Sequence, residues 1–188
     1  MKLYRYLTAK AELLAVAVDA AQADPPDLAS AGAGWRPRLE WWTRLQREAW
    51  QRHPWLPAAV PGDRVLGPNE LGWIDRATAV LEGTGLDGPQ RLDAVLLLAG
   101  QIRATATRAP TGTQPWTAGG RARPVLQRLL EERGGFPAVL AATAGPRAEG
   151  DRDPEFGLRV VLDGLAAAIR AADTVYEGNG STGTGGGA

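Results

Sequence analysis

The sequence predicts an all-α fold, a bundle of six or seven helices without an internal repeat. Apolar residues recur three or four positions apart over most of the chain, and this spacing places them on one face of a helix. No stretch longer than about four residues shows the alternation of β-branched and polar residues that a half-buried strand requires. Glycine and proline separate the periodic segments, so the approximate ends of the helices can be placed as well.

The first two helices are marked by apolar stripes that end at proline. One helix is expected over residues 8–23, and the Asp-Pro-Pro run at 24–26 ends it because proline lacks the backbone N–H that a helix interior needs. A loop rich in glycine, alanine and serine follows. The next helix is expected over residues 35–53, where apolar and aromatic residues fall three or four apart until Pro54.

The downstream half of the chain contains one long, densely apolar helix and several shorter ones. Asp87 is suited to cap the long helix, with Pro89 in its first turn. A loop rich in proline, glycine and threonine, residues 109–120, contains Trp116, and such an interior loop is often functional or mobile. A short apolar turn of helix is expected at residues 55–60, and the remaining helices at 68–81, 87–107, 124–133, 137–142 and 153–176.

Composition excludes several classes of function. Acidic and basic residues balance at 21 each, so binding to nucleic acid through bulk positive charge is not expected. The chain has no cysteine, which rules out disulfides and cysteine-ligated metals. His53 is the only histidine, and we interpret it as a helix-terminal residue, with a role in ligand binding as the less favoured alternative. We expect neither a metal nor a cofactor.

Enzymatic and membrane functions are not expected either. No nucleophile elbow, metal cluster or phosphate-binding loop is present, so a small all-α enzyme is the least favoured hypothesis. The GNGSTG run at 178–183 matches a dinucleotide motif, but a helix precedes it and the chain ends after it. Residues 177–188 are a low-complexity tail, predicted to be disordered. Without a signal peptide or a membrane-spanning apolar run, we expect a soluble, cytoplasmic protein.

Seven tryptophans form the most unusual feature of the composition, and five of them lie within residues 35–55. Trp41 and Trp42 are adjacent on one predicted helix, so their side chains point about 100° apart and cannot both face one narrow core stripe. Tryptophan fills cores well, and aromatic side chains also line small-molecule cavities. Both interpretations remain open from the sequence, with equal weight.

The last predicted helix is apolar on two sides. Phe156, Val160 and Ala167 form the narrower side, with Gly164 near it. The long helix at 87–107 is similarly two-sided and contains small residues that permit close approach. A helix that buries more than one face lies inside a core or between subunits, so we expect a two-fold homodimer. The predicted interface is the broader face of the last helix, Leu158, Val161, Leu162, Leu165 and Ile169.

Four stretches in the same order and spacing carry a resemblance to a known family. They are LYRYLTAKAELLAVAVDAA at 3–21, RHPWLPAAV at 52–60, LGPNEL at 66–71 and EFGLRVVLDGLAAAI at 155–169. The chain resembles the tetracycline-repressor (TetR) family of transcriptional regulators, in particular its C-terminal regulatory domain. The resemblance spans about residues 3–176. Each motif alone is weakly specific, and their order makes the set much more so.

The resemblance implies a division of the chain. Residues 1–7 would be a remnant of the recognition helix of a helix-turn-helix head, and residues 8–176 a ligand-binding and dimerisation domain. Tyr4 and Lys10 match positions that commonly contact the DNA backbone in this family, where a phenol and an ammonium suit phosphate. Most of the head is not within this chain, so binding of operator DNA is expected only if that head is present.

The resemblance also implies a mechanism. A small hydrophobic or aromatic effector would enter a cavity among the helices that begin near Trp35, Asn69 and Asp87, and would release operator DNA by favouring one separation of the linker helices. A metal-tetracycline complex is not expected, because no histidine lies in the corresponding stretch. The alternative is a headless TetR-like ligand-binding or interaction protein. The expected lining is Trp42, Gln46, Trp73, Leu98, Gln101 and Ile102, with Trp116 as a lid.

Overall fold

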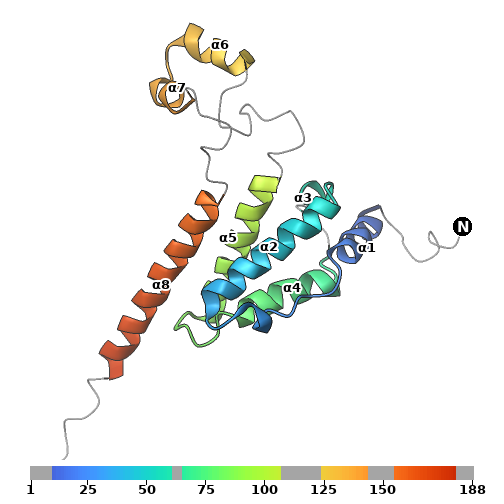
Figure 1. Ribbon diagram of the computed structural model, residues 1–188, viewed down its shortest axis with the longest axis vertical. Helices are drawn as coiled ribbons and strands as arrows, with labels where there is room; N and C mark the ends of the chain where they lie inside the picture. The colour runs from blue at the N-terminus through green and yellow to red at the C-terminus, as the bar shows by residue number, and fades with distance from the viewer. Residues whose placement is uncertain (1–9, 61–64, 107–123, 144–154, 181–188) are drawn as a thin grey trace, which may run out of the picture.

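The computed structural model describes residues 10–60, 65–106, 124–143 and 155–180, and within these ranges the chain is helical without a strand (Figure 1). The all-α prediction is therefore confirmed. The loop at 109–120 and the tail beyond 180 lie outside the described residues. The helices are α1 (Lys10–Gln22), the 3₁₀ turn η2 (Ala29–Ala31), α2 (Trp35–Arg52), α3 (Leu56–Ala59), α4 (Pro68–Ala79), α5 (Gly88–Ala106), α6 (Pro124–Arg133), α7 (Pro137–Thr143) and α8 (Phe156–Gly180).

Helix α5 holds the centre of the bundle, because it contacts α2, α4 and α8 (Figure 1). Helix α1 contacts α3 and α4 and lies on the side of the bundle away from α8 (Figure 1). Helix α8 runs antiparallel to α5: its first turn, at Gly157, lies beside Gln101, and Ala172 lies beside Gly85 just before α5. None of the described helices is both long enough and apolar enough to cross a membrane.

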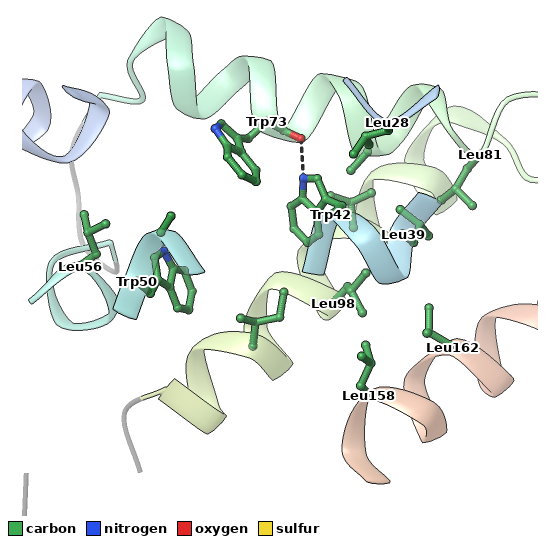
Figure 2. Packing of buried hydrophobic residues seen from close by; sticks show 14 of the residues in the cluster. Leu28, Leu39, Trp42, Trp50, Leu56, Trp73, Leu81, Leu98, Leu158 and Leu162 are labelled. Carbon is green, nitrogen blue, oxygen red and sulfur yellow. Dashed lines mark hydrogen bonds between the residues drawn. The ribbon is translucent and has the colours of Figure 1, made fainter. Parts of the chain in front are cut away.

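One hydrophobic core joins these helices, and Figure 2 shows its packing. The longer helices of the bundle contribute residues spaced three or four apart, as the periodicity predicts. On α5 these are Val95, Leu98 and Ile102, and on α2 they include Leu39 and Trp42. The buried side chains include an unusual share of tryptophan, since Trp42, Trp50 and Trp73 are all nearly inaccessible to solvent.

The helix ends agree with the proline and glycine pattern to within a few residues. Helix α2 ends at Arg52, where the backbone N–H of His53 donates to the Ala49 carbonyl before Pro54. Asp87 and Gln90 cap α5 reciprocally: each side chain accepts a hydrogen bond from the other's backbone N–H, at 2.8 and 3.0 Å. The 3₁₀ turn η2 was not expected from the sequence.

Helices α6 and α7 form a small separate pair. They pack on each other, and Leu130 of α6 is buried but does not belong to the main core cluster. Val125 and Phe136 are exposed, at 84% and 48%. Figure 1 shows this pair apart from α1 to α5. The positions of both helices match the sequence prediction, with α7 ending one residue later.

Candidate functional site

Two tryptophans predicted to line a ligand cavity lie together in the core. Trp42 on α2 and Trp73 on α4 have ring centroids 6.4 Å apart at an interplanar angle of 59°. The Nε1–H of Trp42 donates to the backbone carbonyl of Trp73 at 3.0 Å (Figure 2). Both side chains are buried. Trp41 is only partly buried, and Cζ of the Arg44 guanidinium lies over its ring, 5.1 Å from the centroid. The adjacent side chains of Trp41 and Trp42 therefore lie in two different environments, as predicted.

The same pair is connected to the end of α1. The Nε1–H of Trp73 donates to the carbonyl of Ala23 at 3.3 Å, directly after the last residue of α1. Ala23 has φ of 59°, the left-handed conformation that commonly ends a helix and that is uncommon for a residue with a side chain. The indole of Trp42 therefore links α2 to α4 through a buried hydrogen bond, and that of Trp73 links α4 to the end of α1 through a part-buried one.

A second connection joins α2 to α1 directly. Gln46 on α2 donates from Nε2 to Oε1 of Gln22, the last residue of α1, at 3.2 Å. Both amides are 5% exposed. Buried polar side chains are retained where they are hydrogen-bonded, because an unpaired buried amide is costly. Gln46 was predicted to line the cavity, whereas its partner on α1 was not foreseen.

Helix α1 also caps α4. The Oδ1 of Asp19 accepts a hydrogen bond from the backbone N–H of Glu70 at 3.0 Å, within the first turn of α4. Asn69 Nδ2 donates to the Asp19 carbonyl at 3.1 Å. A carboxylate at a helix N-terminus satisfies a free N–H and complements the helix dipole. The carboxylate therefore comes from a different helix, about 50 residues earlier in the chain, rather than from the residue that precedes α4.

Glycine allows α1 and α4 to approach this closely. A Cβ atom added to Gly67 would lie 2.1 Å from Cγ of Asp19, and one added to Gly72 would lie 2.3 Å from Cγ of Pro25. Both separations are far below a van der Waals contact. Neither glycine has a positive φ, so close packing and not backbone conformation accounts for the lack of a side chain.

The other predicted lining residues divide between the core and its edge. Leu98 and Ile102 of α5 are fully buried and belong to the same cluster as Trp42 and Trp73. Gln101 is half-buried and lies at the contact between α5 and α8. Trp116, Tyr4 and the side chain of Lys10 lie outside the described residues.

A pocket of about 610 Å³ lies in a different place, between α1 and the start of α4. Its surface is mostly apolar, and Glu12 and Asp19 are its charged members. Sequence analysis did not identify it, because its walls come from two segments about 50 residues apart. The lining residues are Ala11, Glu12, Ala15, Val16, Asp19, Val65, Leu66, Gly67 and Pro68.

The broader face of α8, predicted as a dimer interface, turns toward the core of its own chain. Leu158, Leu162 and Ile169 are 6%, 1% and 8% exposed, and Val161 and Leu165 pack against the same cluster. Side chains that already fill this core have little surface left for a second subunit. Exposed apolar side chains of α8 lie instead on its narrower face, where Phe156 and Val160 are 61% and 54% exposed.

Ion pairs hold α8 to α2. Arg36 Nη2 lies 2.7 Å from Oδ1 of Asp163, and Arg47 pairs with Glu155 just before α8. The hydrogen bond to Asp163 raises the pKa of Arg36 above its ordinary value, with a further contribution from Glu40. The Arg36 and Asp163 side chains are 35% and 66% exposed, so this pair lies at the surface. Among the described residues, no three His, Asp or Glu side chains are grouped so that they could hold a metal.

Comparison with known families gives one clear match. Residues 28–169 match the family described as tetracyclin repressor-like, C-terminal domain. This range covers well over half of the chain, from the loop before α2 to Ile169 of α8.

One curated relative is similar beyond that range. The chain is 29% identical over 185 residues to the HTH-type transcriptional repressor DrrR1 of Streptomyces coeruleorubidus. The alignment covers 90% of this chain and 66% of that repressor, so the chain spans just under two thirds of the length of its relative.

Proposed function

The chain belongs to the family of tetracycline-repressor-like C-terminal domains, and from this premise we propose that it is the regulatory part of a transcriptional repressor. Its effector is a small hydrophobic or aromatic molecule that binds among α2, α4 and α5. Binding moves α1 and thereby releases operator DNA. The similarity to a protein named as a repressor supports the regulatory role.

The observation that carries this proposal is the pair of hydrogen-bonded routes from the tryptophan cluster to α1. One route runs from Trp42 to Trp73 and on to Ala23, and the other from Gln46 to Gln22. All the donors are buried or part-buried side chains, so a shift of either tryptophan leaves a polar group unpaired unless α1 follows. A ligand that reorients the cluster therefore changes the free energy of each position of α1.

The effector has to supply the whole switching free energy. A ligand shifts an equilibrium between two arrangements only by the difference between its affinities for them. In the arrangement described here, Trp42 and Ile102 are packed and nearly inaccessible. Effector binding thus favours a second arrangement in which α2, α4 and α5 are further apart, and α1, tied to α2 and α4, moves with them.

We place a homodimer contact on the exposed faces of α5 and α8. Leu96 and Leu97 of α5 are 49% and 62% exposed, comparable with Val160 of α8. Gly100 and Gly164 lie inside these helices, and a Cβ added to either would meet nothing within 4 Å. Glycine inside a helix costs about 1 kcal/mol relative to alanine, and packing among the described residues of this chain does not require it. Close approach by a second copy explains both glycines.

The effector proposal is tested by titrating the chain with a panel of planar aromatic compounds. Binding should quench tryptophan emission and raise the thermal midpoint, because the ligand binds only the folded state. Trp42→Phe, which keeps an aromatic ring but loses the bond to Trp73, should weaken binding about three- to tenfold. A panel that changes neither signal contradicts the aromatic effector.

The repressor proposal needs the protein together with its DNA. A mobility-shift assay should use the product of the whole natural reading frame and the DNA upstream of that frame. We expect a specific shift that the identified compound abolishes. A shift that the compound leaves unchanged contradicts coupling, and the absence of any specific shift favours the headless ligand-binding alternative.

A further inference from the structure

Trp50 differs from the two tryptophans that connect the helices. Its side chain is 4% exposed and belongs to the main core cluster. Its Nε1 is buried and has no hydrogen-bond partner, whereas the indoles of Trp42 and Trp73 both donate to backbone carbonyls. Buried donors in native proteins are paired in the large majority of cases, so an exception requires an explanation.

Trp50 lacks every hydrogen bond that its side chain could make, whereas the other described side chains with a buried, unpaired nitrogen lack only one of several. Two arginines also have a buried Nε without a partner, Arg47 and Arg91. Each of them uses another nitrogen of the same guanidinium in an ion pair, with Glu155 and Glu82 respectively. An arginine has five N–H donors and tryptophan has one. In the described part of the chain, Trp50 is therefore the buried side chain whose only hydrogen-bonding group is unmatched.

Its position relates Trp50 to the proposed effector site. Trp50 follows Gln46 by four residues, so the two side chains lie one turn apart on the same side of α2. Figure 2 shows its indole beside Leu56 of α3, in the same cluster as Trp42 and Trp73. The unmatched donor thus belongs to the same core as Trp42 and Trp73 and lies one turn of α2 beyond Gln46, which was predicted to line the effector site.

We propose that the effector carries a carbonyl-type oxygen that accepts a hydrogen bond from Trp50 Nε1. This inference rests on the proposed function and narrows its effector to a planar aromatic ketone or a close analogue. In the packing described here, the buried indole N–H of Trp50 has no hydrogen-bond acceptor, which disfavours that packing. A ligand that brings an acceptor restores the bond only in the bound state, and this difference contributes to the shift between states.

A matched pair of probes tests the acceptor directly. 9-Fluorenone and fluorene have the same planar three-ring shape, and only the ketone carries an acceptor oxygen. The dissociation constants of both should be measured for the wild type, for Trp50→Phe and for Trp55→Phe. Trp55 is 42% exposed and serves as a control for the loss of an indole elsewhere.

We expect the wild type to bind fluorenone about three- to tenfold more tightly than fluorene, the range that one net hydrogen bond provides. Trp50→Phe should bind both probes equally, while Trp55→Phe keeps the preference. A second measurement compares the two probes on the wild type alone. In ¹⁵N–¹H spectra, fluorenone should move the indole N–H resonance of Trp50 downfield, and fluorene should not. Sequential assignment of the wild-type spectrum identifies that resonance, so this measurement does not depend on whether Trp50→Phe folds.

The outcomes separate this inference from the function on which it rests. Equal binding of the two probes to the wild type overturns the inference and leaves the aromatic effector intact. The inference is also overturned if Trp50→Phe still binds fluorenone more tightly than fluorene, or if fluorenone does not change the chemical shift of the Trp50 indole. Neither result contradicts the aromatic effector. If neither probe binds, the aromatic effector site itself is contradicted, and the inference is overturned with it.

Discussion

The contacts of α1 with α4 and of α2 with α8 join helices by different means. At the first contact, Asp19 caps α4 and two glycines permit side chains to lie against the backbone. At the second, the polar links are ion pairs between half-exposed side chains such as Arg36 and Asp163. The first depends on shape, because the atoms that meet have little freedom. The second combines these exposed ion pairs with buried leucines of α8, such as Leu158 and Leu162, that pack into the core.

The difference between the α1–α4 and α2–α8 contacts indicates which of them can transmit a movement. A junction that admits no extra methyl group cannot slide, so α1 and α4 behave as one unit. Ion pairs between flexible side chains persist while helices shift by small amounts, and the buried leucines of α8 keep this helix on the core. The proposed switch therefore relies on the α1–α4 junction, while α8 maintains the proposed dimer.

The largest effect is expected at the close junction. Gly72→Ala places a methyl group against Pro25, and overpacking of this kind costs about 1–3 kcal/mol, more than the roughly 1 kcal/mol that alanine gains in a helix. Because the added Cβ would lie 2.3 Å from Cγ of Pro25, we expect a cost at the upper end of that range and a net fall in the free energy of unfolding of about 1–2 kcal/mol, measured by urea denaturation. A variant as stable as the wild type would show that α1 and α4 can separate without cost.

A smaller effect of opposite sign is expected from the same substitution on α8. Gly164→Ala has open space, so at concentrations where the chain is monomeric it should raise the free energy of unfolding by about 1 kcal/mol. If a second copy packs closely on this face, the added methyl group should also raise the dimer dissociation constant in sedimentation experiments. An unchanged dissociation constant would remove Gly164 from the proposed interface.

The smallest effect is expected at the ion pair. Arg36→Gln should lower the free energy of unfolding by less than about 1 kcal/mol, as for other exposed pairs, and the difference should shrink in about 1 M salt. The raised pKa of Arg36 adds stability that is fully present below its ordinary pKa and is lost only as the pH rises through the raised value. The effect should therefore be constant from about pH 6 to about pH 9. A larger, salt-independent loss would show that this junction also depends on shape.

The sequence predicted the helices well because their signals are local. Proline and glycine mark the ends of α2 and α6, and spacing of three or four identifies the buried face of α5. The turn η2 was missed because its local bond, from the backbone N–H of Ala29 to Asp27, has no apolar pattern. Helix α8 runs to Gly180, past the predicted end near residue 176, because helix formation there does not follow an apolar stripe.

The site could be predicted only in part, because its geometry is set between distant segments. The tryptophans and Gln46 were identified by residue type, but the carbonyl of Ala23 and the amide of Gln22 as their partners depend on how α1 packs. Periodicity also showed that α8 is apolar on two sides. It could not show which side meets the core of the same chain, since both sides have the same spacing.

The left-handed turn at Ala23 and the cap by Asp19 fix α1 to α4 at its C-terminal half, and this has a geometric consequence. Helix α1 has 13 residues, so its first residue lies about 20 Å along the axis from the C-terminal end at Ala23. Rotating α4 by about 5° would swing the far tip of α1 by roughly 2 Å, a lever action that follows from the rise per residue. Two such arms pivoting in opposite directions would double the displacement between their tips, so even a modest rearrangement around the tryptophans is amplified at a distance.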